Sequence, residues 1–389
     1  MIGLKRKRRG ATKEAHIPYT TPPLDRRMLL LVLLLAAIGS VMVFSASYAN
    51  ALARYGDAYY FIKRQMIWLA LGISAMMLVS RLSFELLYRL TPYLFLVTAI
   101  LLIAVLVIGK SGGGAQRWIA IGSLTFQPSE LGKATLVFML ARHFTRHKEA
   151  VLDSKNERRA FLLGTLAPLG YIGLFCGLVA LEKHLSCIII LGMLGVTLMF
   201  AAGSRLRYLG IFGALGTAGV SAMALFTDYT KRRILIWQNP AAYPLDGGWQ
   251  TLQGLMAIGS GGVFGLGLGN SRLKYSYVSE PQNDFIFTIT CEELGLFGAL
   301  AILALFLAFL WRGYTIAMRA EDGFSSLVVF GIVTKVTLQV LLNVAVVTNA
   351  IPNTGISLPF FSYGGSSLVM LFAEMGLILS ASRHAHIRS

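Results

Sequence analysis

Long apolar stretches follow one another along most of the chain, separated by short polar connections. A stretch of roughly 18 or more apolar residues is long enough to cross a membrane as a helix. The clearest are residues 28–49, 91–109, 161–181, 185–203, 206–227, 326–348 and 359–381. Others carry charged residues within an apolar run, at 59–80, 129–144 and 284–311. The pattern predicts an all-α polytopic membrane protein with about ten transmembrane helices.

Composition agrees with this pattern, because 56% of the 389 residues are hydrophobic and only 14% are charged. These values exclude an ordinary soluble domain of this length. The first apolar run has full spanning length and lacks a small-residue cleavage site, so we expect it to remain as the first helix.

The basic residues indicate an orientation. The formal net charge is +17, and lysine and arginine gather at the amino terminus and around 142–160. An even number of crossings puts both termini on one side, and cytoplasmic segments carry an excess of lysine and arginine. We therefore expect a basic cytoplasmic tail at 1–27, a transmembrane domain at 28–382 and a cytoplasmic tail at 383–389. Membrane lipid, and not nucleic acid, accounts for the charge.

Two loops then fall on the outer face, at 110–128 and at 228–283, the longer one preceding the eighth helix. A loop this long is usually functional or disordered, and its aromatic residues argue against disorder. Its glycine-rich run at 259–269 lacks the context of a nucleotide-binding loop. The run either forms a tight re-entrant turn, which we favour, or exposes amides to a diphosphate.

Asp284 is the first candidate for chemistry, because it lies where the long outer loop enters the eighth helix. An aspartate at that place often caps the helix. A carboxylate at the edge of an apolar cavity is also suited to act as a general base. The sequence leaves both interpretations open.

Glu130 and Lys133 are the second candidates, three residues apart in an apolar run. At that spacing they share a helix face, and a mutual ion pair would explain why both are tolerated there. The alternative is a lysine that is oriented by its glutamate and presented to an anionic ligand.

Basic residues are scarcer on the outer face than inside. Those that we consider for binding an anionic substrate are Arg117, Lys231, Arg232, Arg233 and Lys274. For each one taken alone, an exposed loop charge is the ordinary explanation. In the last apolar region, a break at Gly364 and Gly365 indicates either a discontinuous helix that lines a polar site or close helix packing.

The cysteines are Cys176, Cys187 and Cys291, all in apolar segments. Their odd number and placement support neither a disulfide framework nor a zinc site. No motif for an organic cofactor is present.

Four segments together resemble a known family. They are GAQRWIAIGSLTFQPSELGK (114–133), AIGSGGVFGLGLGNS (257–271), NDFIFTITCEELG (283–295) and NTGISLPFFSYGGSS (353–367). Their order and content are similar to the SEDS family of FtsW, RodA and SpoVE, over nearly the whole membrane region. The GLGNS element and the basic tail look nearer to FtsW and SpoVE than to RodA.

The resemblance implies a peptidoglycan glycosyltransferase that polymerises lipid II on the outer face of the bacterial cytoplasmic membrane, in cell division or related wall synthesis. It implies that Asp284 is catalytic, that Glu130 and Lys133 are the family's intramembrane acid and base, and that Ser362 belongs to its SYGGSS motif. The implied partners are a class B penicillin-binding protein, a transpeptidase, and other division proteins. Many members have a sequence like QPDLGT before the sixth helix, whereas residues 182–187 of this chain read EKHLSC. This difference puts any role of that segment in doubt.

The residues fit this chemistry. Lipid II needs an apolar groove for its chain, cations for its departing diphosphate and a base for the acceptor 4-hydroxyl. We expect Asp284 to be the base and Lys133 with the outer arginines to surround the diphosphate. A divalent cation, Mg²⁺ or Mn²⁺, is an optional aid to the leaving group, although no dedicated metal site is visible.

Two rival functions remain. One is a lipid II flippase or transporter that uses the ionisable residues within its helices, which are Glu292, Glu293, Lys335 and Glu374. The other is a non-catalytic scaffold for division proteins.

Overall fold

The computed structural model describes residues 24–112, 115–121, 124–153, 155–226, 228–244, 248–275 and 281–384. Nearly all of the tail expected at 1–27, and most of the one expected at 383–389, lie outside these residues.

Helices dominate the described part of the chain. Those long and apolar enough to cross a membrane are α1 (Arg26–Tyr55), α2 (Tyr60–Val79), α3 (Phe84–Ile108), α6 (Glu157–Phe161) continued by the π-helix η1 (Leu162–Leu166) and α7 (Ala167–Leu181), α12 (Ile286–Met318), α13 (Gly323–Val347) and α14 (Gly365–His384). Beside them run α4 (Pro128–Arg146), the shorter apolar α8 (Leu185–Ala201) and α9 (Leu206–Phe226). Each predicted span thus falls on a helix, and the predicted all-α polytopic fold is confirmed.

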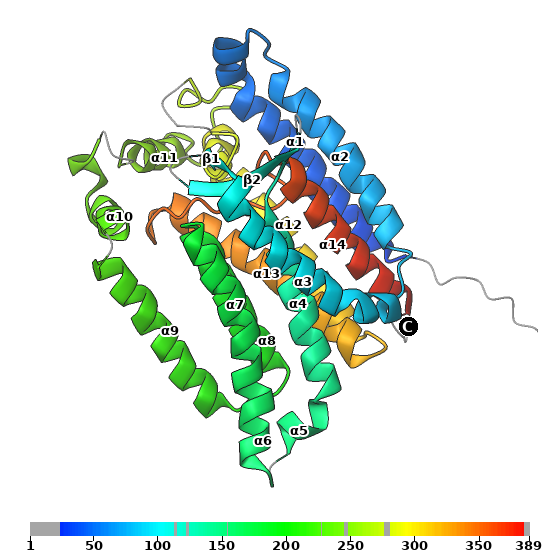
Figure 1. Ribbon diagram of the computed structural model, residues 1–389. Helices are drawn as coiled ribbons and strands as arrows, with labels where there is room; N and C mark the ends of the chain where they lie inside the picture. Colours follow the sequence, from blue (N-terminus) through cyan, green and yellow to red (C-terminus); the bar gives the residue numbers. More distant parts are fainter. Residues whose placement is uncertain are drawn as a thin grey trace, which may run out of the picture.

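The helices form one bundle, drawn in Figure 1. In it α14 packs along α2, α12 contacts α1 and α13, and α4 lies at the centre against α3, α7, α8 and α13. Helix α9 packs against α8 and α10 (Asp228–Gln238) and stands at the side of the bundle (Figure 1). The central place of α4 explains why a helix with charged residues is largely buried.

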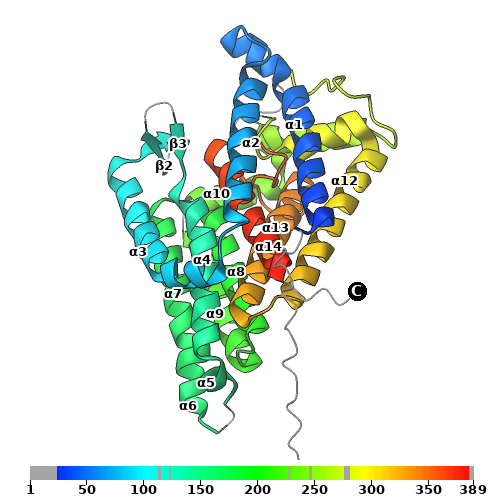
Figure 2. The same ribbon diagram turned by 90° about the vertical axis from the view of Figure 1, so that its right-hand side faces the viewer.

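The beginning of α1 and the end of α14 meet at one end of the bundle (Figure 2). The backbone N–H of Asp25 donates to Ser382 Oγ at 3.2 Å, and the Asp25 carboxylate accepts from Arg312 Nε at 2.8 Å. An even number of crossings follows. We call this the basic end, and the opposite end, with the residues between α3 and α4, the outer end.

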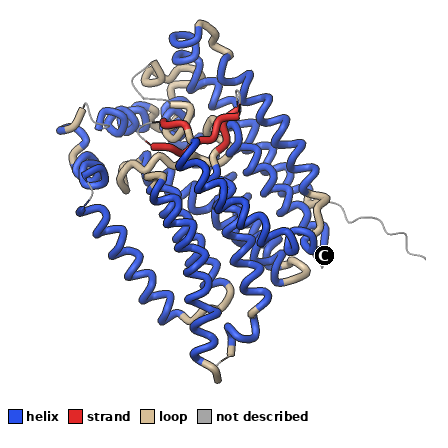
Figure 3. The backbone as a smooth tube through the Cα atoms, in the orientation of Figure 1, coloured by secondary structure: helices blue, strands red, loops and turns tan. Residues whose placement is uncertain are grey.

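A small antiparallel sheet covers the outer end, where the sequence suggested only a loop. Its strands are β1 (Lys110–Gly112), β2 (Ala115–Ile121) and β3 (Leu124–Phe126), in the order β1-β2-β3. Lys110 pairs with Trp118, and Ile119 pairs with Phe126. Figure 3 shows the strands lying over one end of the helices. The sheet carries Arg117 and leads directly into α4.

The long outer loop is also folded. It contains α10, the 3₁₀ turn η2 (Pro240–Ala242) and α11 (Gly248–Ser260), which packs on α12. The glycine run after α11 lies backbone to backbone on α12, where an added Cβ at Gly261 or Gly265 would come within 2.1 or 2.2 Å of a carbonyl oxygen. It meets α12 at a kink, where Gly295 has φ 66°. These contacts favour the tight-turn interpretation of the run.

The last predicted span starts later than expected. Apolar character suggested a helix from 359, but α14 begins at Gly365. Phe360 has φ 66°, which a helix cannot contain, and its carbonyl rests against α1 where Gly39 leaves room. Gly365 is therefore the start of a helix and not a break within one.

Candidate active site

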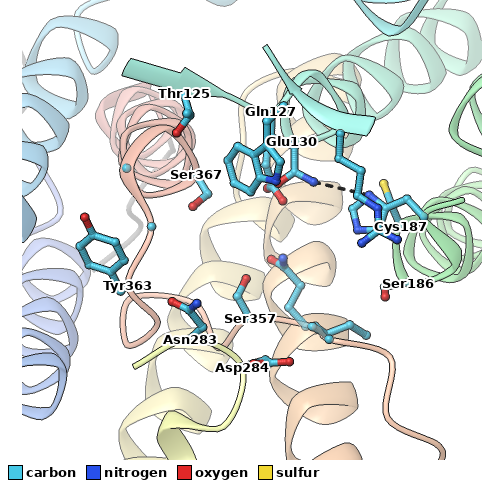
Figure 4. A pocket seen from close by; sticks show the side chains of 18 of the residues that line it. Thr125, Gln127, Glu130, Ser186, Cys187, Asn283, Asp284, Ser357, Tyr363 and Ser367 are labelled. Carbon is cyan, nitrogen blue, oxygen red and sulfur yellow. Dashed lines mark hydrogen bonds between the residues drawn. The ribbon is translucent and has the colours of Figure 1, made fainter. Parts of the chain in front are cut away.

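A cavity of about 860 Å³ opens at the outer end, between the sheet, the beginnings of α4 and α8, and the segment before α14. Figure 4 shows Asp284 and Asn283 across it from Gln127 and Glu130. Its polar lining comprises Arg64, Arg117, Thr125, Gln127, Glu130, Lys133, His184, Ser186, Arg233, Asn283, Asp284, Gln339, Ser357, Tyr363 and Ser367. The cavity therefore gathers residues that lie far apart in the sequence.

Asp284 lies on the cavity wall just before α12. The N-cap residue of α12 is Phe285, with no side-chain cap hydrogen bond. Asp284 is therefore not the N-cap residue of α12. The backbone is fixed instead by α13, where Asn343 Nδ2 donates to the Asp284 carbonyl at 2.8 Å and to the Ile356 carbonyl at 2.7 Å. Asn343 ties the aspartate to the segment before α14.

Ser362 holds the neighbouring residue. Its hydroxyl donates to the Asn283 carbonyl at 2.8 Å and accepts from the N–H of Leu358 at 2.8 Å. The next N–H, of Tyr363, donates to the Gln282 carbonyl at 2.8 Å. Ser362 does not line the large cavity, so its contacts are those of a residue that positions Asp284.

We expect Ser362→Ala to lower the turnover of the site about tenfold with little change in substrate affinity. The change removes one buried and one partly buried hydrogen bond, which together contribute about 1–3 kcal/mol to the free energy of unfolding, and it loosens the backbone beside Asp284. Steady-state kinetics of the purified variant check this. Ser366→Ala is the matched control, because the buried Ser366 hydroxyl has no hydrogen-bond partner among the described residues. Equal turnover in the two variants would contradict the prediction.

Glu130 and Lys133 form an ion pair in the first turns of α4, with Nζ 2.8 Å from Oε1. Pro128 occupies the first helical position, so the chain turns from the sheet directly into the helix. The side chains are 13% and 4% exposed, and both line the cavity. The predicted ion pair is confirmed, and its placement also leaves the lysine next to any ligand of the cavity.

Arg117 and Arg233 bring further positive charge to the cavity. Arg117 Nη2 donates to the Lys183 carbonyl at 2.6 Å, and Arg233 Nη1 donates to the Asn353 carbonyl at 2.9 Å. Lys231 and Arg232, from the same helix as Arg233, are exposed and do not line the cavity. Of the basic cluster at 231–233, the structure brings only Arg233 to the site.

Lys274 requires a correction, because it lies behind α12 and not at the cavity. It is 2% exposed, and its Nζ lies 3.0 Å from Glu293 Oε1 and 2.6 Å from the Gly269 carbonyl. Glu293 also accepts from Ser45 Oγ. A lysine held in this way fastens the glycine run to α12 and does not reach a ligand in the cavity.

Arg64 is a cavity residue that the sequence analysis did not select. Its guanidinium lies over the Tyr60 ring, 4.2 Å from the centroid, near the outer end of α2. The sequence did show Arg64 as a charged residue inside the predicted span 59–80. A charged side chain near a helix end, however, usually extends to the membrane surface, so Arg64 was not selected. Trp68 and Leu71, further along α2, give the same side of the cavity an apolar wall.

The segment 182–187 also belongs to the site, although its sequence had put its role in doubt. His184 lines the cavity, and its Nδ1 lies 3.5 Å from both Gln127 Nε2 and Ser129 Oγ. Burial, together with the charges of Arg117 and Lys133, lowers the pKa of His184 to about 3. The imidazole is therefore neutral at physiological pH and adds hydrogen bonding without charge.

Glu182, at the other end of this segment, is 1% exposed. Neither carboxylate oxygen has a hydrogen-bond partner among the described residues. Burial raises the pKa of Glu182 to about 8, against the opposing effect of Arg117. The carboxyl is therefore neutral near pH 7 and leaves the charge of Arg117 uncompensated.

With this geometry in view, the sequence comparisons identify the family. Residues 25–387 match the FtsW, RodA and SpoVE family of cell cycle proteins. The chain belongs to this family.

Individual SEDS relatives are similar to the chain over nearly their full length. The chain is 35% identical to stage V sporulation protein E of Bacillus subtilis over 363 residues, 93% of this chain and 97% of that one. It is 36% identical to the probable peptidoglycan glycosyltransferase FtsW of Geobacter sulfurreducens over 361 residues, 92% of this chain and 95% of that one. Among solved structures, a chain of a peptidoglycan synthase complex that coordinates polymerisation and crosslinking superposes with a TM-score of 0.77 at 26% identity, covering 94% of this chain and 99% of that one.

The SEDS segments recognised in the sequence divide into two groups in the structure. Residues of 114–133, 283–295 and 353–367 line the cavity. The fourth segment, 257–271, packs behind it on α12. Three of the four segments thus form the site, and the fourth supports it.

Proposed function

We propose that this SEDS protein is a peptidoglycan glycosyltransferase that polymerises lipid II on the outer face of the bacterial cytoplasmic membrane. One observation carries the proposal. Asp284 and a set of cationic side chains share one cavity at the end of the bundle opposite the basic end. The relatives named FtsW supply the reaction class.

The reaction uses the two kinds of residue differently. Asp284 removes the proton of the acceptor 4-hydroxyl, and the oxygen attacks the anomeric carbon of the donor. The bond from that carbon to the diphosphate oxygen breaks, and undecaprenyl diphosphate leaves. Lys133, Arg117 and Arg233 stabilise the negative charge that develops on it.

The apolar lining fits a lipid-linked substrate. Ile67, Trp68 and Leu71 on α2 line one wall, and Ile190 on α8 lines another. These side chains lie next to the cationic residues, so a polyprenyl chain and its diphosphate can be bound side by side.

A divalent cation is a proposal with weaker support in this chain. No group of three or more His, Cys, Asp or Glu side chains that could hold a metal ion occurs among the described residues. Of the two cavity carboxylates, Glu130 is held by Lys133. We propose that a divalent cation, if it assists, arrives on the diphosphate.

We propose a class B penicillin-binding protein, a transpeptidase, as the partner. The chain superposes on a component of a complex that coordinates polymerisation with crosslinking. We also propose other division proteins as partners, since the family is one of cell cycle proteins.

The test of the function is whether purified, detergent-solubilised protein converts lipid II into glycan chains, with and without a cognate transpeptidase. We expect polymer on a gel. A flippase needs two compartments and yields none in detergent, and a scaffold yields none either. The flippase rival loses support because Glu292, Glu293, Lys335 and Glu374 are all engaged in hydrogen bonds or ion pairs.

Glu182 gives this activity an expected pH dependence. Above its pKa of about 8, the carboxylate ionises beside Arg117 and offsets the charge that attracts the diphosphate. We expect the KM for lipid II to rise severalfold between about pH 7 and about pH 9. Because the folded pKa of about 8 exceeds the usual 4.5, the contribution of neutral Glu182 to fold stability is full below about pH 4.5 and is lost as the pH rises from there to about 8. Glu182→Gln should abolish the rise in KM, and a rise of equal size in that variant would show another origin.

A further inference from the structure

Four ionisable side chains meet inside the bundle, next to the proposed catalytic cavity. Lys335 on α13 and Glu374 on α14 form an ion pair, and their side chains are 3% and 2% exposed. Glu130 and Lys133 on α4 form the other pair, which is 13% and 4% exposed. Each pair is neutral as a whole, so neither requires the other on grounds of net charge.

The two pairs are nevertheless linked. Glu130 and Lys335 line the same small cavity of about 30 Å³, together with Gln339, Ser357 and Ser367. Those three residues also line the large cavity. Lys335 interacts electrostatically with Glu130, as Glu374 does with Lys133. The carboxylate of Glu130 is thus attracted by two ammonium groups, those of Lys133 and Lys335.

Fold stability does not explain the Lys335–Glu374 pair. Burying two charges is costly, and apolar residues of similar volume in their place are often neutral or stabilising. The pair is also imperfect, because Glu374 Oε1 has no hydrogen-bond partner in the described part of the chain. Ionisable residues kept inside a membrane domain usually serve its function.

Lys335 changes how much of the positive charge of Lys133 a ligand in the cavity experiences. If Glu130 were paired with Lys133 alone, its charge would cancel that of the lysine as seen by a ligand. An additional positive group beside Glu130 offsets part of the carboxylate charge, which matters at the low dielectric of the bundle interior. Glu374 in turn holds the Lys335 ammonium group in place.

We propose that Lys335, held by Glu374, is a positioning residue of the active site, which shares the carboxylate of Glu130 and so leaves the charge of Lys133 to the substrate diphosphate. This inference rests on the proposed function. It assigns a role to two residues that do not touch the substrate.

The test compares two double variants of the full chain. In Lys335→Met with Glu374→Met the buried charges are gone, and we expect the thermal midpoint to be unchanged or higher. The KM for lipid II and the Kd for undecaprenyl diphosphate should each rise about tenfold, with kcat within about twofold. In Lys335→Glu with Glu374→Lys the ion pair is kept, but a carboxylate now faces Glu130, so the loss of affinity should be larger.

A pair that only stabilised the fold would behave in the opposite way. The exchanged pair would then keep wild-type affinity, and the methionine variant would lose thermal stability without a change in KM or Kd. Either result overturns the proposal, and if the methionine variant does not fold, the exchanged pair decides. Arg312→Gln with Asp25→Asn is the matched control, because that pair lies at the basic end and should leave KM unchanged.

The two readouts separate this inference from the proposed function. Absence of polymer from the wild-type protein would refute the function, while the Kd for undecaprenyl diphosphate would still report on the cation site. Wild-type polymerisation with unchanged KM and Kd in both double variants would refute the role of Lys335 alone.

Discussion

Asp284→Asn should reduce glycan polymerisation by at least about a hundredfold, which is the usual contribution of a general base. Asparagine has nearly the same shape as aspartate but cannot take up the proton of the acceptor hydroxyl. The backbone of Asp284 is held through its carbonyl by Asn343, and substitution of the side chain does not disturb that bond. The loss should therefore fall on the chemical step.

The measurement is polymer formation by the purified variant, together with its thermal midpoint and its Kd for lipid II. We expect the thermal midpoint and the Kd for lipid II to stay near their wild-type values. Asp284→Glu, which keeps the carboxylate but moves it by one methylene, should retain part of the activity. Full polymerisation by Asp284→Asn would remove Asp284 from the mechanism.

Lys133→Met should weaken the binding of lipid II about 10- to 100-fold, because a hydrogen bond to a charged group contributes about 1.5–3 kcal/mol. The single change also leaves Glu130 without the ion-pair partner that lies 2.8 Å away, and breaking a buried pair costs about 3–5 kcal/mol. Part of the effect of this variant could therefore come from a loss of stability.

A second variant separates the two effects. In Lys133→Met with Glu130→Gln no buried carboxylate is left unpaired, so we expect the thermal midpoint to recover. Affinity for lipid II should stay low, because the cation next to the ligand is still missing. Recovery of affinity together with stability would demote Lys133 to a structural role.

Much of the fold could be predicted from the sequence, since a membrane allows few alternatives. Apolar runs of spanning length must become helices, and the basic residues indicate which end faces the cytoplasm. The sheet at 110–126 was missed because β1 and β3 have only three residues each and glycines lie between the strands. The start of α14 was misplaced because apolar character does not reveal the positive φ of Phe360.

Part of the site could also be predicted, because charged residues are conspicuous in the sequence of a membrane protein. Glu130 and Lys133 stand out because charges are rare in apolar runs, and Asp284 because it lies at the mouth of one. Lys274 was misassigned because its partner, Glu293, becomes its neighbour only when the glycine run folds onto α12. His184 gave no comparable signal, since a polar residue in a short loop is ordinary.

The bonds that hold the backbone around Asp284 have a consequence for biosynthesis. Asn343, Ser362 and Tyr363 all follow Asp284 by more than a full helix in the chain. A chain still attached to the ribosome before α13 and α14 have been inserted carries the aspartate without its supports. A chain truncated before α13 would lack all three residues, so its proposed base would be present but its backbone would not be held in place.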